Sequence, residues 1–227
     1  MLYTFGDSYT WGANFSDDDK SISVWPYFLS KRLGCDFKNL ATGGSSNWRT
    51  ARVLNSLELT EDDCVVIAWS SPIRFEFGVN INHKPPPILE GRYGDTLQYD
   101  SSSLVVKRFY PQLIDRTSDD KAMPILSSVY GNTACFYNED WFEEMFLIMF
   151  NSCRYKLESS KCKWLCFNTW CVQSNIDYIN TKLNIPQYYM GSNNHLSDKN
   201  NIGVYWTKKE HEIIADNLFV KFEELYG

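Results

Sequence analysis

The sequence predicts an α/β fold in which helices cover both faces of a parallel β-sheet, giving three layers. Apolar runs of strand length alternate along the chain with segments of helical periodicity, as parallel strands joined by helices require. The clearest strand, Cys64–Trp69, is continuously apolar, which is typical of a strand covered on both faces. Clusters of turn-forming residues follow the first three expected strands, and the carboxyl ends of parallel strands are where such sheets bind ligands.

The first 76 residues predict three strands separated by two helices. The first helix has apolar residues at helical spacing, Pro26 near its start and Gly34 as a stop signal directly after it. The acidic run 17–19 and Lys20 are expected in a solvated loop before it. The five elements are, in chain order, a strand over 2–5, a helix over 24–33, a strand over 37–40, a helix over 47–57 and a strand over 64–69.

Periodicity is lost from Phe77 to about Thr133, where prolines, serines, glycines and aspartates are scattered. A structureless loop of this length is improbable in a compact domain, so we expect 78–133 to be an insertion with some short structure, either a lid or an assembly arm. Beyond it the pattern predicts a helix over 140–157, a strand over 163–167, a fifth strand over 186–190 and a last helix over 207–225. Thr207 and Glu210 form a capping box for that last helix. The whole chain, 1–227, is expected to be one domain.

Composition excludes several classes of function. The net charge is −6 and no basic block is present, which argues against nucleic-acid binding. No apolar stretch approaches the roughly 20 residues that span a bilayer, and no signal peptide is recognised, so synthesis in a cytoplasm is expected. The seven cysteines follow no clear metal-ligand spacing and predict reduced, mostly buried thiols. A disulfide framework or a metal site is the alternative.

The strongest chemical signal is Gly6-Asp7-Ser8, directly after the first strand. A nucleophilic serine needs a tight turn with backbone N–H groups nearby, although the same three residues also suit an ordinary turn. Similar clusters follow the second strand (39–47) and the third strand (67–76). With these three segments in order, the chain resembles the SGNH (GDSL-like) hydrolase family, and most of all its phage-encoded subgroup.

The resemblance implies a flavodoxin-like parallel sheet of about five strands and an esterase activity without cofactors. It places Ser8 as the nucleophile and the N–H groups of Ser8 and Gly44 in the oxyanion hole. The asparagine that follows the third strand in the family is absent here, because Ser70 and Ser71 stand at that point. Two roles remain open for Asn47: it substitutes for the missing amide in the oxyanion hole, or it caps the helix that follows.

The resemblance is incomplete at the general base, because the family's Asp-x-x-His motif before the last helix is missing. Tyr205-Trp206 stands where the histidine and proline are expected. Of the three histidines, His83 lies in the insertion and is not expected to act. His195, with Asp198 to orient it, and His211 in the first turn of the last helix remain the two candidate bases, and a chain with no functional base is the third possibility.

Two further side chains complete the candidate site. Asp7 and Arg74 are expected to contact the substrate, and Arg74 could equally pair internally with Glu76. The main hypothesis is an esterase that acts on a small or carbohydrate-linked ester, and removal of an acetyl group is one reaction of this kind. The alternatives are a catalytically impaired module with a binding or structural role, for instance as a self-associating component of a virus particle, and a cofactor-binding domain that uses the loop 43–46 for phosphate.

Overall fold

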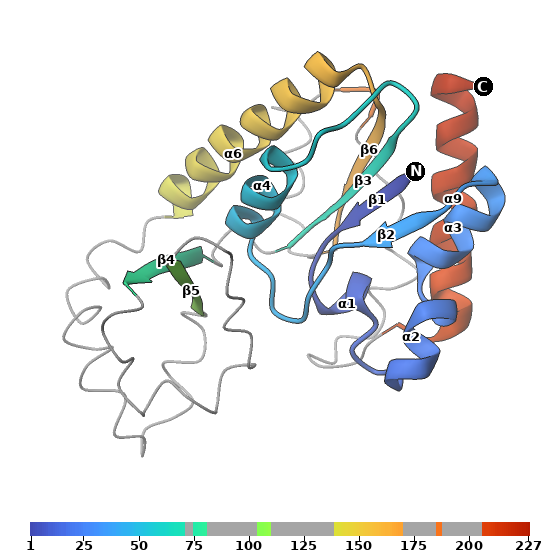
Figure 1. Ribbon diagram of the computed structural model, residues 1–227, viewed down its shortest axis with the longest axis horizontal. Helices are drawn as coiled ribbons and strands as arrows, with labels where there is room; N and C mark the ends of the chain where they lie inside the picture. The colour runs from blue at the N-terminus through green and yellow to red at the C-terminus, as the bar shows by residue number, and fades with distance from the viewer. Residues whose placement is uncertain (71–74, 81–103, 110–138, 170–184, 188–205) are drawn as a thin grey trace.

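The computed structural model describes residues 1–70, 75–80, 104–109, 139–169, 185–187 and 206–227 (Figure 1). Its centre is a parallel sheet in the order β2-β1-β3-β6. The strands are β1 (Leu2–Phe5), β2 (Phe37–Asn39), β3 (Cys64–Trp69) and β6 (Lys163–Asn168). The predicted α/β fold with a parallel sheet is confirmed, and the first and third strands have the predicted bounds.

Helices lie on both faces of this sheet, and the direction of each crossover decides which face. The chain runs from β1 outward to β2 through α3 (Trp25–Leu33), then returns past β1 to β3 through α4 (Asn47–Asn55). Right-handed crossovers in opposite directions place their helices on opposite faces of a sheet. Figure 1 shows this arrangement, with α4 and α6 (Glu139–Ser160) on one face and α3 and α9 (Lys208–Tyr226) on the other.

The two faces carry separate apolar cores. Phe5, Ile67 and Trp69 pack against Phe146 and Phe150 of α6. On the other face, Leu2, Val66 and Ala68 pack against residues of α3 and α9. Because successive residues of β3 point to opposite cores, the strand has to be apolar throughout, as its sequence predicted.

The segment after β1 holds two short helices instead of the expected solvated loop. These are α1 (Ser8–Trp11) and α2 (Asp17–Ser23). Ser16 caps α2, since its side chain accepts a hydrogen bond from the Asp19 N–H. The acidic run is therefore the first turn of a helix, where negative charge is favourable, so the prediction of a loop over 17–20 was wrong.

An antiparallel pair, β4 (Phe75–Asn80) and β5 (Leu104–Phe109), begins just before the expected insertion 78–133 and continues into it. The remaining residues of the insertion lie outside the described part of the chain. Most of the predicted fifth strand also lies outside the described part of the chain. Gln187 is described, and its carbonyl accepts a hydrogen bond from the Cys166 N–H at 3.0 Å. The predicted helix over 140–157 is confirmed and extends to Ser160, and the capping box of Thr207 and Glu210 is present.

Three further observations concern the described residues alone. None of their helices is long and apolar enough to cross a bilayer. No group of three or more potential metal ligands occurs among them. Their five cysteines are thiols without disulfide partners, and burial raises the pKa of Cys153 and Cys166 to about 12.

Candidate active site

The candidate site lies where the strand order reverses. β2 and β3 flank β1 on opposite sides, so the loops after β1 and β3 diverge at their carboxyl ends, the point at which sheets of this kind bind ligands. Two hydrogen bonds join the β2 loop to β1: the Leu40 N–H donates to the Thr4 carbonyl at 2.8 Å, and the Thr42 N–H donates to the Gly6 carbonyl at 3.4 Å. The predicted segments at the carboxyl ends of β1 and β2 therefore meet.

The turn that carries Ser8 is built by Gly6 and Asp7. Asp7 is 2% exposed and caps α1, where its Oδ1 accepts a hydrogen bond from the Tyr9 N–H at 3.1 Å. Ser8 is the first residue of α1, and Gly12 ends the helix in the left-handed region at φ +79°. Because the Asp7 carboxylate is buried against its own helix, the expected contact of Asp7 with substrate is not supported, and its role is to hold the turn.

Ser8 itself is half-buried. Among the described residues, none forms a hydrogen bond with its Oγ, and none accepts one from the backbone N–H of Ser8 or of Gly44. Gly44 has a φ of +70°, a left-handed conformation that favours glycine. Within the described part of the chain, the backbone N–H groups of Ser8 and Gly44 thus have no protein acceptor.

Gly6 allows this turn to close because no side chain fits at its position. A Cβ built there would lie 2.3 Å from Thr10 Oγ1, 2.7 Å from Thr10 Cβ and 3.1 Å from Ala68 Cβ. Thr10 cannot rotate away at no cost, because its Oγ1 accepts a hydrogen bond from the buried Trp25 indole N–H at 3.3 Å. The glycine of the motif is thus explained by packing under α1.

We expect Gly6→Ala to lower the free energy of unfolding by about 1–3 kcal/mol through overpacking. Urea denaturation measures this loss of unfolding free energy, with Gly34→Ala as the control variant. Gly34 also has a positive φ, +64°, but nothing lies within 4 Å of its Cβ position. Only the conformational cost of about 1 kcal/mol is expected there. Equal losses of stability in Gly6→Ala and Gly34→Ala would contradict the tight packing at Gly6. Adding Thr10→Ala to Gly6→Ala should recover part of the lost stability.

Asn47 connects the β2 loop to the end of β3. Its side chain is 1% exposed. The Asn47 Nδ2 donates to the Ser70 carbonyl at 2.8 Å, and Oδ1 accepts from the Ser70 N–H at 2.9 Å. The cap of α4 is Ser46, whose Oγ accepts from the Arg49 N–H. The prediction that Asn47 caps the helix was wrong, and its burial against Ser70 does not support the oxyanion role either.

Asn47→Ala is expected to cost more stability than the loss of the true cap. The alanine leaves the buried N–H and carbonyl of Ser70 without partners, at about 1–3 kcal/mol for each group. Ser46→Ala should cost only about 1 kcal/mol, as other cap substitutions do. Chemical denaturation of both variants compares the two losses. A smaller loss for Asn47→Ala than for Ser46→Ala would contradict the bridging role.

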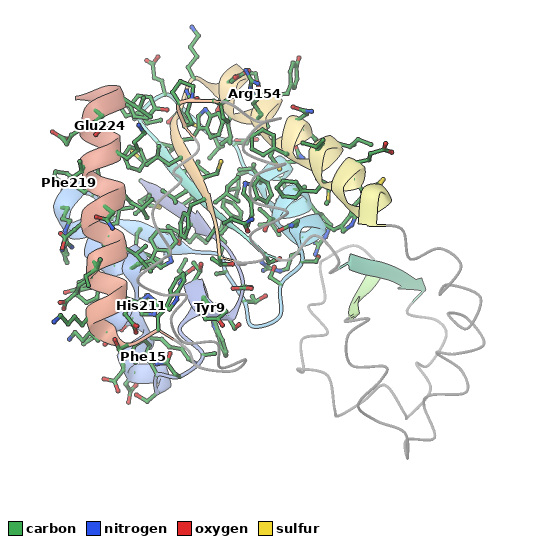
Figure 2. All side chains as sticks on the ribbon, turned by 180° about the vertical axis from the view of Figure 1, so that it is seen from behind. Tyr9, Phe15, Arg154, His211, Phe219 and Glu224 are labelled. Carbon is green, nitrogen blue, oxygen red and sulfur yellow. The ribbon has the colours of Figure 1, made fainter. Side chains whose placement is uncertain are left out.

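His211, one of the two expected bases, is completely buried, at 0% exposure. Its Nδ1 accepts a hydrogen bond from the Trp25 backbone N–H at 3.1 Å. The rings of Phe15 and Trp206 lie on either side, each with its centroid 5.5 Å away. Burial lowers the pKa of His211 to about 4, against which the nearby Glu210 acts only weakly. Figure 2 shows His211 with Phe15 near the start of α9.

This environment does not suit a general base. Because Nδ1 accepts from Trp25, the neutral ring carries its hydrogen on Nε2, and a nitrogen that already holds a hydrogen cannot take the serine proton. No described residue accepts a hydrogen bond from that Nε2–H. The expectation that His211 is the base is therefore contradicted by its contacts, and the residue joins α9 to α3.

The start of α9 nevertheless lies beside α1, the helix that begins with Ser8. The Tyr9 and Trp206 rings are 5.0 Å apart, and the Asn14 side-chain amide donates to the Trp206 carbonyl at 3.0 Å. The chain that leads into α9 thus ends next to α1, and Figure 2 shows Tyr9 and His211 at this same end of the molecule. His195, Asp198 and Arg74 lie outside the described residues, so their predicted roles stay predictions.

Two contributors near Ser8 were not predicted. Asn39, the last residue of β2, donates from Nδ2 to the Thr10 carbonyl at 3.0 Å and accepts from the Ala41 N–H at 3.2 Å. It was part of the second segment, but an asparagine at a strand end looks like any turn former. Trp11 is the other contributor. Its side chain is 37% exposed, and nothing in the sequence distinguishes it from a buried tryptophan.

Comparisons with known proteins show the fold. No protein-family model matches the sequence, and no curated protein is significantly similar to it. A crystal structure of TesA matches with a TM-score of 0.52 at 11% identity, covering 99% of this chain and 98% of that one. The chain has the SGNH-hydrolase fold. A second structure with this fold, a carbohydrate esterase described as having divergent catalytic and non-catalytic binding functions, matches with a TM-score of 0.52 at 10% identity over 100% of this chain and 69% of that one.

The shared fold accounts for the strand order of the central sheet. At 10 to 11% identity it carries no residue-level information, so the chemistry depends on the contacts described above.

Proposed function

We propose that this protein is a serine hydrolase acting on a small or carbohydrate-linked ester, with Ser8 as the nucleophile. The observation that carries the proposal is Ser8 at the reversal of strand order, with an Oγ that no described residue engages and with the N–H groups of Ser8 and Gly44 similarly left for a ligand. Ser8 attacks the ester carbonyl, and the two N–H groups stabilise the oxyanion that forms.

His195 is the base in this proposal, with Asp198 to orient it. The contacts of His211 remove the other candidate, and the loop that contains His195 leads into Trp206, which packs on Tyr9 next to Ser8. The base takes the Ser8 proton during attack and returns it to the leaving alcohol, and water then releases the acyl group by the same route. None of these steps requires a metal or an organic cofactor.

Labelling with a fluorophosphonate tests the proposal, because this probe reacts with activated serines. We expect one labelled site, on the peptide that contains Ser8, and turnover of p-nitrophenyl acetate that the label abolishes. A chain that takes no label, or takes it at another serine with full loss of turnover, would overturn the assignment of Ser8.

A second candidate is a catalytically impaired module of the same fold with a binding or structural role, for instance in a virus particle. The missing Asp-x-x-His motif before the last helix favours it. Ligand binding without labelling or turnover is its expected signature, so the same experiment separates the two candidates.

A further inference from the structure

Trp11 is a large side chain that the nucleophile turn leaves partly exposed, at 37%. It follows Ser8 by three residues in α1, and residues at this spacing lie on the same face of a helix. Its indole also touches the loop that carries Gly44: a Cβ built on Gly43 would lie 3.3 Å from Cε3 and Cζ3 of Trp11. The ring therefore starts from the Ser8 side of α1 and approaches the loop that contains Gly43 and Gly44.

Lys20 of α2 holds the indole in place. Its Nζ lies 3.7 Å from the ring centroid, which is a close cation–π contact. Gly12 ends α1, and a Cβ built there would lie 2.5 Å from a methyl carbon of Val24, so the connection from α1 toward α2 is tightly packed at this residue. An aromatic surface fixed before binding loses little conformational entropy when a ligand covers it.

We propose that Trp11 forms a subsite for a carbohydrate ring of the substrate, on the indole surface that Lys20 and Gly43 leave open. This inference rests on the proposed ester hydrolase and specifies its substrate class. An alkyl chain binds best in an enclosed apolar pocket, whereas the open part of Trp11 faces water and has polar neighbours, including Lys20.

A pyranose ring suits both the aromatic face of Trp11 and its polar, water-facing surroundings. Its axial C–H groups carry a slight positive charge and pack against the negative face of an aromatic ring. Its hydroxyl groups point outward, where they keep hydrogen bonds to water and to polar side chains. A sugar ring on Trp11 therefore lies beside Ser8, where an acyl group on one of its hydroxyls can meet the nucleophile.

Binding is tested first, without turnover, in the Ser8→Ala variant titrated with an acetylated methyl xyloside. The chain has eight tryptophans, and the indole N–H resonance of Trp11 is the one that disappears in Trp11→Phe. We expect this resonance to shift on titration and the Kd to rise at least about tenfold in Ser8→Ala/Trp11→Ala. Tyr155→Ala is the matched control, because Tyr155 is a more exposed aromatic residue, at 77%, next to Arg154 at the opposite end of the molecule (Figure 2). A Trp11 resonance that does not move, or an unchanged Kd, would overturn the subsite.

Kinetics with two acetyl esters then separate the subsite from the chemistry. Trp11→Ala should lower kcat/KM for the acetylated methyl xyloside at least about tenfold and for ethyl acetate less than about threefold, because only the sugar covers the indole. Trp11→Phe should lose less kcat/KM for the sugar ester than Trp11→Ala does, because phenylalanine keeps an aromatic face. Equal losses on both esters contradict a carbohydrate subsite. If the wild-type protein hydrolyses neither ester, the proposed function fails, while the titration still decides the subsite.

Discussion

Ser8→Ala is expected to lower kcat/KM for p-nitrophenyl acetate by at least about 1,000-fold, because the covalent route is lost together with Oγ. The fold should be unaffected, since Ser8 is half-buried and no described residue forms a hydrogen bond with its side chain. Residual hydrolysis is expected from the backbone N–H groups of residue 8 and Gly44, which the substitution keeps. Initial rates over a range of substrate concentrations measure the loss.

Three comparison variants sharpen this result. Ser21→Ala, in the exposed α2 helix, should retain wild-type activity. His195→Ala should lose nearly as much activity as Ser8→Ala, and the double variant should lose little more, because nucleophile and base act as one unit. His211→Asn should retain activity within about tenfold of the wild type, since His211 is not the base. Full activity of Ser8→Ala, or a larger loss in His211→Asn than in His195→Ala, would refute the assignment.

The central fold follows from the sequence because burial on both faces leaves a clear pattern. β1 and β3 have their predicted bounds since β3 is continuously apolar, β1 is apolar except for Thr4, and each ends at a turn former. α2 was missed for the converse reason: its residues, Asp17–Ser23, are mostly polar and exposed, so no apolar stripe marks a helix. Its signal is the cap, Ser16 with Asp19 three residues later, which is easily mistaken for a loop.

The site was only partly predictable, because side-chain partners distant in sequence decide the roles of its residues. The nucleophile turn and the Gly43–Gly44 loop are local features, and their positions followed from strand order. Asn47 depends on Ser70, 23 residues away, and His211 on Trp25, 186 residues away. Sequence spacing gives no information about such pairs, so a buried structural histidine looked the same as a base.

The second large effect concerns stability and pH, and it comes from the burial of His211. Burial lowers the folded-state pKa of His211 from 6.5 to about 4, so the unfolded chain binds the proton more tightly. The contribution of the neutral ring is complete above about pH 6.5 and is lost as the pH falls toward 4, which amounts to about 3 kcal/mol. Protonation also places a hydrogen on Nδ1, facing the Trp25 N–H, so the ring loses the contact that joins α9 to α3.

Urea denaturation at pH 7, 5.5 and 4.5 tests this for the wild type, His211→Asn and His211→Leu. Asn keeps an acceptor for the Trp25 N–H, whereas Leu leaves that buried donor unsatisfied, so His211→Leu should be less stable than His211→Asn at pH 7 by about 1–3 kcal/mol. Both variants should lose the part of the pH dependence that belongs to His211, and the wild-type advantage over His211→Asn should shrink as the pH falls. All other titrating groups are common to the three proteins, so they cancel in the differences. Parallel stability curves for wild type and His211→Asn would show that the ring titrates normally, and would thereby reopen its candidacy as the base for Ser8.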